Sequence, residues 1–119
     1  VPSLTLRELR SSREGEPSSA IRERILQARN RQLKRFADTD IYANARMRAS
    51  DIKRHCAIRE QDGVLLENAM DEFRLSARAY DRILRVARTI ADLDGSEAIE
   101  SDHLMEAIQY RSLDRSIFH

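Results

Sequence analysis

The sequence lacks the features that mark disulfide-rich, membrane-spanning or strongly charged proteins. Cys56 is its one cysteine, so no internal disulfide can form, which points to a reducing compartment. No apolar run approaches the roughly 20 residues that cross a bilayer, and no signal peptide is visible. Lys and Arg number 21 against 20 Asp and Glu, so the net charge is only +1. These absences favour a cytoplasmic protein without membrane contact.

The sequence also lacks the groups of a self-contained enzyme. Its 3 glycines lie too far apart to form a phosphate-binding G-x-x-x-x-G-K-[ST] loop, and no acidic strand end offers ligands for Mg²⁺. His55, Cys56 and His103 do not form a tetrahedral metal set, because no second cysteine or nearby histidine completes it. We therefore expect no catalytic residue, metal or cofactor site within these residues.

The chain does contain helical periodicity. Charged residues make up 34% of it and hydrophobic residues 41%, which suits a helical protein. Apolar residues recur at helical spacing in four stretches, and a short helix is expected between the first two. The expected ranges are Ser18 to about Ala37–Asp40, about Asp51–His55, about Glu60–Phe73, Ser76 to Gly95, and from Ser101 onwards. We predict a compact all-α domain of about four main helices over residues 18–119, with residues 1–17 as an extended connector.

The pattern also predicts the helix caps and the core. Serines at 18 or 19, 50 and 76 are the expected starts of helices, and Gly95 is the expected stop of the helix that Ser76 begins. The expected core consists of the periodic apolar residues, namely Ile21, Ile25, Ala28, Leu33, Phe36, Val64, Leu65, Ala69, Met70, Phe73, Tyr80, Ile83, Leu84, Ala87, Ile90, Ala91, Ile99, Leu104, Ala107 and Ile108.

Arg78 is the most informative residue in the sequence. It falls at about the second position of the helix capped by Ser76, where the helix dipole already places positive charge. The same helix end binds anions readily, so an arginine there makes sense if a phosphate neutralises both. The alternative is a solvated arginine paired with Asp81 or Glu72. The residues by themselves leave both interpretations open.

Arginines recur on exposed helix faces. Arg78, Arg82, Arg85 and Thr89 fall on one stripe of their helix, and the helix from Ser18 carries further basic residues, among them Arg22 and Arg29. Such a pattern usually marks a solvated face; contact with a neighbouring subunit or with DNA phosphates is the functional alternative. Arginine far outnumbers lysine. This excess suits bidentate contacts to carboxylate or phosphate, and a GC-rich source genome explains it equally well.

Several segments in the right order resemble the C-terminal domain of magnesium-chelatase-like AAA+ ATPases, of the competence-associated ComM/YifB-type helicase family. The matching segments are Gly15-Glu16-Pro17-Ser18-Ser19, Ile21–Arg24, Ala28–Gln32, Asn44-Ala45-x-Met47, Leu75–Leu93 and His103–Arg111. The resemblance covers the chain from Gly15 to about Arg115.

This resemblance implies a function. In AAA+ proteins the small helical domain is a lid over a nucleotide held by a preceding ATPase domain, and Arg78 matches the sensor-2 arginine that reaches the nucleotide phosphates. ATP and Mg²⁺ would then belong to a longer parent protein, with an upstream ATPase domain and neighbouring subunits of a homo-oligomeric ring as partners. Arg82, Arg85, Arg22 and Arg29 are candidates for subunit or DNA contacts. The alternative is a stand-alone helical module that binds nucleic acid or docks on a protein.

Overall fold

The computed structural model describes the backbone of residues 17–118 and the side chains of residues 17–110. All regular structure in this range is helical. The elements in chain order are α2 (Ser18–Arg35), the 3₁₀ turn η1 (Asn44–Arg46), α3 (Ala49–His55), α4 (Glu60–Phe73), α5 (Ala77–Leu93) and α6 (Ser101–Phe118). The all-α prediction is confirmed, with the short α3 bringing the α-helices of the described chain to five. The connector predicted for residues 1–17 lies, apart from Pro17, outside the described residues.

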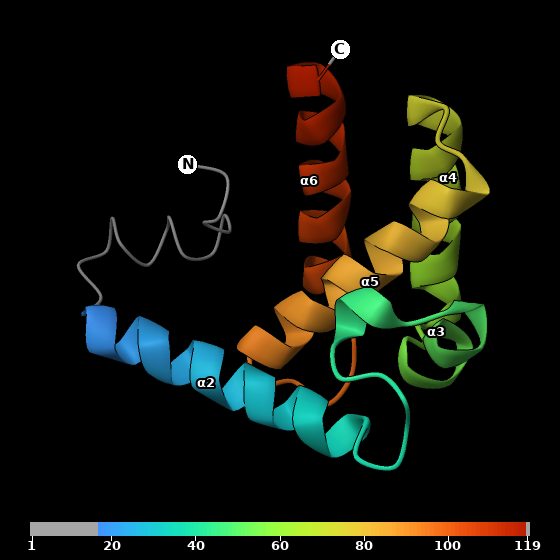
Figure 1. The fold of residues 1–119 in the computed structure, drawn as a ribbon. Helices are drawn as coiled ribbons and strands as arrows, with labels where there is room; N and C mark the ends of the chain where they lie inside the picture. The colour runs from blue at the N-terminus through green and yellow to red at the C-terminus, as the bar shows by residue number, and fades with distance from the viewer. Residues whose placement is uncertain (1–16, 119) are drawn as a thin grey trace.

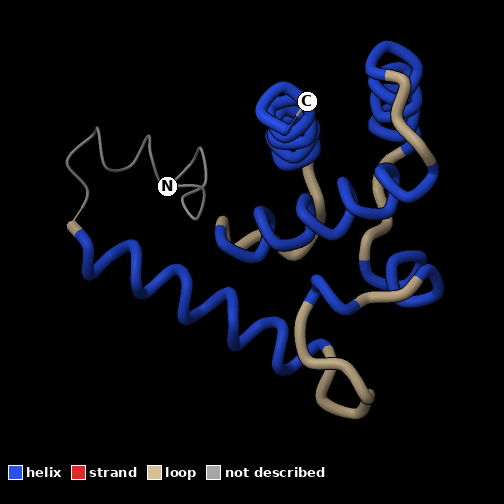
Figure 2. Tube along the Cα trace, turned by 45° about the horizontal axis from the view of Figure 1, so that its top comes forward, coloured by secondary structure: helices blue, strands red, loops and turns tan. Residues whose placement is uncertain are grey.

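Helix α5 runs through the middle of the domain, and the other helices lie around it (Figure 1). Its C-terminal end lies beside α2, its N-terminal end follows α4 directly, and α6 stands against its length (Figure 2). The 17 residues of α5 span about 25 Å at 1.5 Å per residue. Consequently α2 and α4 occupy opposite ends of the domain.

The sequence of α5 explains its central place. Ile83, Leu84, Ala87, Ile90 and Ala91 are all at most 4% exposed, so one side of the helix is a continuous apolar stripe. The apolar residues just before α6 and in its first half pack against this stripe. Ile99, Leu104, Ala107 and Ile108 are buried, as predicted.

Gly95 ends α5 as predicted, with φ at +72°. The Gly95 N–H donates to the Asp92 carbonyl at 3.1 Å, and the Ser96 N–H donates to the Ala91 carbonyl at 2.9 Å. This paired pattern is the Schellman motif, which satisfies the last carbonyls of a helix and requires a left-handed residue. It turns the chain back so that α6 can pack on α5.

Several predictions about caps and core were wrong. Pro17, and not Ser18 or Ser19, is the N-cap of α2, and its carbonyl accepts the Ala20 and Ile21 N–H groups at 3.1 and 3.3 Å. Arg48 precedes α3 in place of the expected Ser50, and its N–H donates to Asp51 Oδ2 at 3.0 Å. Helix α2 ends at Arg35, slightly before the predicted range.

Three apolar residues expected in the core are instead exposed. Ile25 is 41% exposed, Leu33 52% and Val64 53%, while Leu66 of α4, which was not expected in the core, is fully buried. Helical periodicity places residues on a common face, but it does not say whether another element covers that face. The exposed residues lie on α2 and α4, the two helices at the ends of the domain.

Candidate functional site

The capped start of α5 places Arg78 as the sequence predicted. Ser76 has extended backbone angles, and its hydroxyl accepts the Ala79 N–H at 3.3 Å. Arg78 is therefore the second helical residue, beside N–H groups of the first turn that have no acceptor within the helix. Its side chain is exposed, and no hydrogen bond or ion pair joins it to any residue that the structure describes. The alternative of a pair with Asp81 or Glu72 is thus not formed.

The corner between α4 and α5 fixes this helix start closely. Arg74 ends α4 in the left-handed conformation, with φ at +53° and ψ at +51°. Only three residues separate the two helices, and the Leu75 N–H among them donates to the Met70 carbonyl at 2.9 Å. A non-glycine residue in this conformation stores some strain. The short connection leaves α5 little freedom to move relative to α4, and both Arg74 and Arg78 are exposed at the corner.

The predicted arginine stripe of α5 is only partly open. Arg82 is exposed, but Arg85 is half-buried and donates from Nη1 to the Met47 carbonyl at 3.3 Å. Thr89 is half-buried too, and its hydroxyl donates to the Arg85 carbonyl at 3.1 Å. The turn η1 covers this part of the helix, so the expectation that all four residues face solvent was wrong. Arg82 and Arg85 instead line a hollow of about 370 Å³ together with Tyr110 and Thr89.

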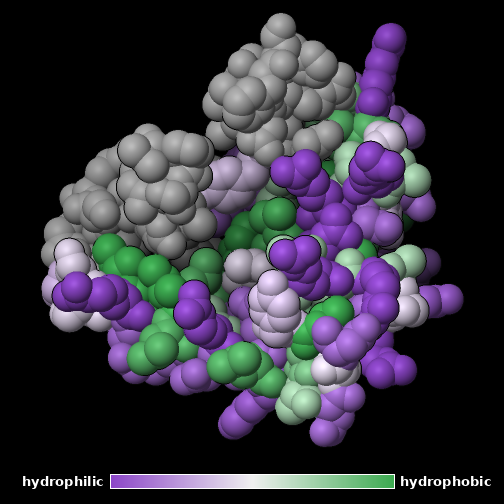
Figure 3. All heavy atoms as spheres, viewed as in Figure 1, coloured by the Kyte–Doolittle hydropathy of each residue, from purple (hydrophilic) through white to green (hydrophobic). Residues whose placement is uncertain are grey.

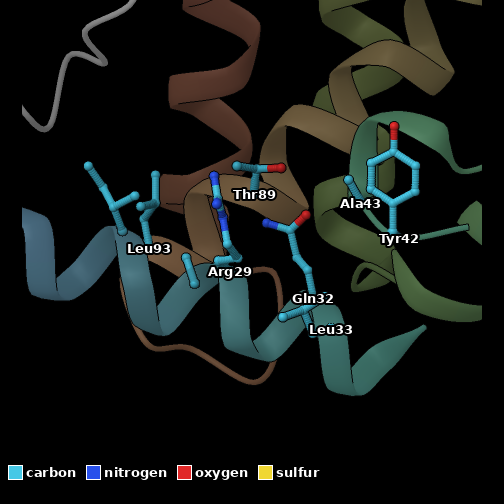
Figure 4. A pocket seen from close by; sticks show the side chains of 9 residues that line it. Arg29, Gln32, Leu33, Tyr42, Ala43, Thr89 and Leu93 are labelled. Atoms are coloured by element: carbon cyan, nitrogen blue, oxygen red, sulfur yellow. The ribbon is translucent and has the colours of Figure 1, made fainter. Parts of the chain in front are cut away.

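A second, larger cleft separates α2 from α5. Its volume is about 610 Å³, and Thr89 and Leu93 border both it and the first hollow. Figure 3 shows apolar atoms gathered along the surface formed by α2, with hydrophilic atoms around them. Figure 4 shows Arg29 and Gln32 pointing from α2 towards Thr89 of α5. Of the predicted arginines, this cleft contains Arg29 alone.

The predicted arginines therefore fall into three places. Arg78 lies at the N-terminal end of α5, Arg82 and Arg85 lie along its middle, and Arg22 and Arg29 lie on α2. The last two are exposed and pair with no residue in the described part of the chain. The structure does not gather these five side chains into one anion site.

A buried ionic network, which the sequence analysis missed, joins α2 to α5. Asp92 is fully buried, and Arg35 donates to its two carboxylate oxygens at 2.7 and 2.8 Å. Asn44 Nδ2 donates to the same carboxylate at 2.8 Å, and Arg88 Nη2 lies 3.3 Å from it. Arg88 is only 4% exposed, and desolvation lowers its pKa from the ordinary value.

Other atoms complete the network. Arg88 donates to the carbonyls of Ser96 and Glu97 at 2.9 and 3.0 Å, just past the end of α5. Asn44 also accepts from Arg35 at 2.9 Å and donates to the Thr89 hydroxyl at 3.1 Å. A bidentate guanidinium–carboxylate pair has a fixed geometry. It therefore sets the position of α2, and of η1 through Asn44, against the C-terminal half of α5.

The sequence held one signal of this network. Arg88 and Asp92 are spaced i, i+4 and flank the apolar stripe of α5, so a charged pair at the edge of a buried face was visible. Asn44 and Met47, which carry part of the family resemblance, are 1% and 3% exposed. Their role in this structure is to anchor η1.

A three-residue cluster lies between α5 and α6. One ligand atom each from Asp94, Asp102 and His103 lies within 4.8 Å of the others. His103 is buried, accepts the Glu100 N–H on Nδ1 at 2.9 Å and contacts Asp94 from Nε2 at 2.9 Å. Both ring nitrogens are thus used in closing the start of α6 onto the end of α5, so the cluster acts as a structural link in this conformation.

The other two residues weighed as metal ligands, His55 and Cys56, lie at the end of α3, where Cys56 is buried and His55 is half-buried. Burial raises the pKa of the Cys56 thiol to about 11, so the thiol is protonated at neutral pH. Burial, helped by the charge of Arg35, lowers the pKa of His55 from its ordinary value. The His55 ring packs edge-on against Phe36, with ring centroids 5.5 Å apart. These contacts are those of packed core residues.

Comparison with known proteins places the chain in a family. Residues 15–111 match the family model described as the C-terminal domain of magnesium chelatase subunit ChlI. The chain belongs to this family. The match runs from just before α2 into α6, and it contains both the buried network and the Arg78 corner.

Relatives within the family extend the comparison. The protein YifB of Escherichia coli (strain K12) is 40% identical over 105 residues, which is 88% of this chain and 20% of YifB. Competence protein ComM of Haemophilus influenzae is 42% identical over 101 residues, which is 85% of this chain and 19% of ComM. Rv2897c of Mycobacterium tuberculosis is 31% identical over 101 residues, again 85% of this chain and 20% of the relative.

The chain thus spans about a fifth of the length of these relatives. Within the described residues, no helix combines the length and the apolar character that crossing a membrane demands.

Proposed function

We propose that this chain is the helical lid of a magnesium-chelatase-like AAA+ ATPase, in which Arg78 contacts the phosphates of a nucleotide bound on a preceding domain. The observation that carries the proposal is the state of Arg78, which is exposed, lies at a capped helix N-terminus and has no acceptor among the described residues. Family membership supports it. ATP and Mg²⁺ would be held by the longer parent protein, and this chain by itself would not hydrolyse ATP.

Electrostatics gives the lid its dependence on nucleotide. The start of α5 combines the positive end of a helix dipole, free N–H groups and a guanidinium with five donors. A phosphate would neutralise this concentration of positive charge in the closed state. Loss of the γ-phosphate removes negative charge from the opposite side, so closure weakens and the lid can swing away.

The proposal extends to the partners of the parent protein. We propose that the parent protein forms a homo-oligomeric ring, with the exposed Arg82, Arg22 and Arg29 facing neighbouring subunits or DNA, and that the machine remodels DNA. The family resemblance supports this role, and one relative bears the name competence protein. Exposed arginines suit contacts to phosphate backbones and to carboxylates alike.

The test of the sensor role is Arg78→Ala in the full-length parent protein. We expect nucleotide affinity or ATPase turnover to fall by at least about tenfold, because one preorganised donor to a reacting phosphate is lost. Arg54→Ala is the matched control, since Arg54 is an exposed arginine of α3 without an assigned role. ATP affinity and turnover that stay unchanged in Arg78→Ala would refute the sensor role.

The second candidate is a stand-alone module that binds nucleic acid. The observation in its favour is that Arg22, Arg29 and Tyr42 are all exposed, with Tyr42 at 63%. Binding of DNA by the 119-residue chain with a steep salt dependence would support it. Absence of binding at low salt would remove it and leave the lid as the remaining function.

A further inference from the structure

Two helices at opposite ends of the domain carry exposed stripes of opposite charge and equal spacing. On α2 the stripe is Arg22, Leu26 and Arg29. On α4 it is Glu60, Val64 and Glu67. Both sets follow the spacing i, i+4, i+7, which places three side chains within about 60° of one helix face. In each, two like charges lie about 10.5 Å apart along the axis with an apolar residue between them.

Neither stripe pairs with another part of the described chain. Leu26 is 54% exposed and Val64 53%, and both rank among the large exposed hydrophobic residues. The four charged side chains are exposed and form no ion pair with other parts of the described chain. Each stripe therefore presents two like charges and one exposed apolar side chain, with no partner among the described residues.

The fold prevents the two stripes from meeting in one copy. The Arg35–Asp92 pair fixes α2 at the C-terminal end of α5, and the three-residue corner fixes α4 at the N-terminal end. About 25 Å of helix separates the two ends. An intermolecular contact has no such restriction.

We propose that α2 of one copy of this chain docks against α4 of a second copy, with the Arg22–Leu26–Arg29 stripe on the Glu60–Val64–Glu67 stripe. Because the spacings are equal, two salt bridges and one apolar contact form in the same register. The two surfaces differ, so the contact is head-to-tail, which builds a ring when the rotation closes and a filament when it does not. This contact specifies how neighbouring subunits of the proposed ring meet. It rests on the proposed homo-oligomeric ring and not on the proposed role of Arg78.

Charge reversal in both stripes tests this contact in the 119-residue chain. The wild-type chain should self-associate with increasing concentration in sedimentation velocity at low salt, and less so at about 0.15 M, where the Debye length falls to about 8 Å. The Arg22→Glu/Arg29→Glu variant should lose on the order of tenfold in association, since two attractive pairs become repulsive. The Glu60→Arg/Glu67→Arg variant should behave in the same way.

Mixing the two reversed variants should restore association, because each now offers the charge that the other requires. Lys53→Glu/Arg54→Glu is the control for the Arg22→Glu/Arg29→Glu variant, with the same change in net charge on exposed residues of α3. Oxidation of a mixture of Leu26→Cys and Val64→Cys chains should also give a cross-linked heterodimer, since Cys56 is buried.

A wild-type chain that stays monomeric at low salt, or reversed variants that stay apart when mixed, would overturn the proposal. So would a control that loses association as fully as the stripe variants. None of these outcomes bears on the nucleotide assay with Arg78→Ala, so failure of this contact and failure of the sensor role can be told apart.

Discussion

Replacing Asp92 by asparagine should destabilise the domain severely. Asp92 is fully buried, and its two carboxylate oxygens accept hydrogen bonds from Arg35 at 2.7 and 2.8 Å. Asn keeps the shape of the side chain but removes the charge, which leaves Arg35 and Arg88 without their counter-ion. The side chains of these arginines are 14% and 5% exposed, so water compensates little.

The magnitude follows from the burial of the network. Removing one partner of a buried ion pair costs about 3–5 kcal/mol. That is a large part of the roughly 5–15 kcal/mol by which a domain is stable. At about 4 °C per kcal/mol, Tm should fall by roughly 12 °C or more. Arg88 keeps two carbonyl acceptors, at Ser96 and Glu97, so most of the cost should arise at Arg35.

Urea unfolding followed by circular dichroism measures this effect, with Asp38→Asn as a control on an exposed carboxylate. The control should change the free energy of unfolding by less than about 0.5 kcal/mol. A double-mutant cycle with Arg35→Met should show strong coupling to Asp92. A loss below about 1 kcal/mol in Asp92→Asn would refute the view that this network fixes α2 on α5.

Two further predictions concern glycine and pH. Gly95→Ala should lower the free energy of unfolding in urea by about 1 kcal/mol, because φ is +72° there. Gly63→Ala in α4, with open space around it, should raise that free energy by about 0.5–1 kcal/mol. Effects of the same sign would contradict this reasoning. The lowered pKa of His55 means that the unfolded chain binds more protons than the folded one as pH falls through about 6.5, so Tm should drop between about pH 7 and pH 5. In His55→Gln this slope should be shallower, and an identical slope would contradict the assignment to His55.

Much of the fold could be predicted because the decisive signals are local. Ser76 and Gly95 bracket α5, and both act as predicted since a cap hydroxyl and a positive φ depend on the nearest few residues. The bounds of α4 agree with the prediction for the same reason. The place of Arg78 at the start of its helix followed from the cap by counting residues.

Apart from the caps of α2 and α3, what the sequence did not predict concerns partners far apart in the chain. Arg35 and Asp92 are 57 residues apart, and nothing near either of them shows that they meet. Ile25, Leu33 and Val64 have the periodicity of core residues, yet no element of the described chain covers them. Thr89 was placed on an open face because η1, which covers it, has no periodicity by which to place it.

The sequence by itself therefore determined the helices, both ends of α5, most of its apolar stripe and the position of Arg78, because these depend on contacts within a few residues of one another. Tertiary structure alone decided that Asp92 is buried between two arginines, that the arginines fall into three separate places, and that α2 and α4 end on opposite sides of the domain. Those outcomes depend on which helix faces meet. Charge and hydropathy show that a face needs a partner, and only packing selects it.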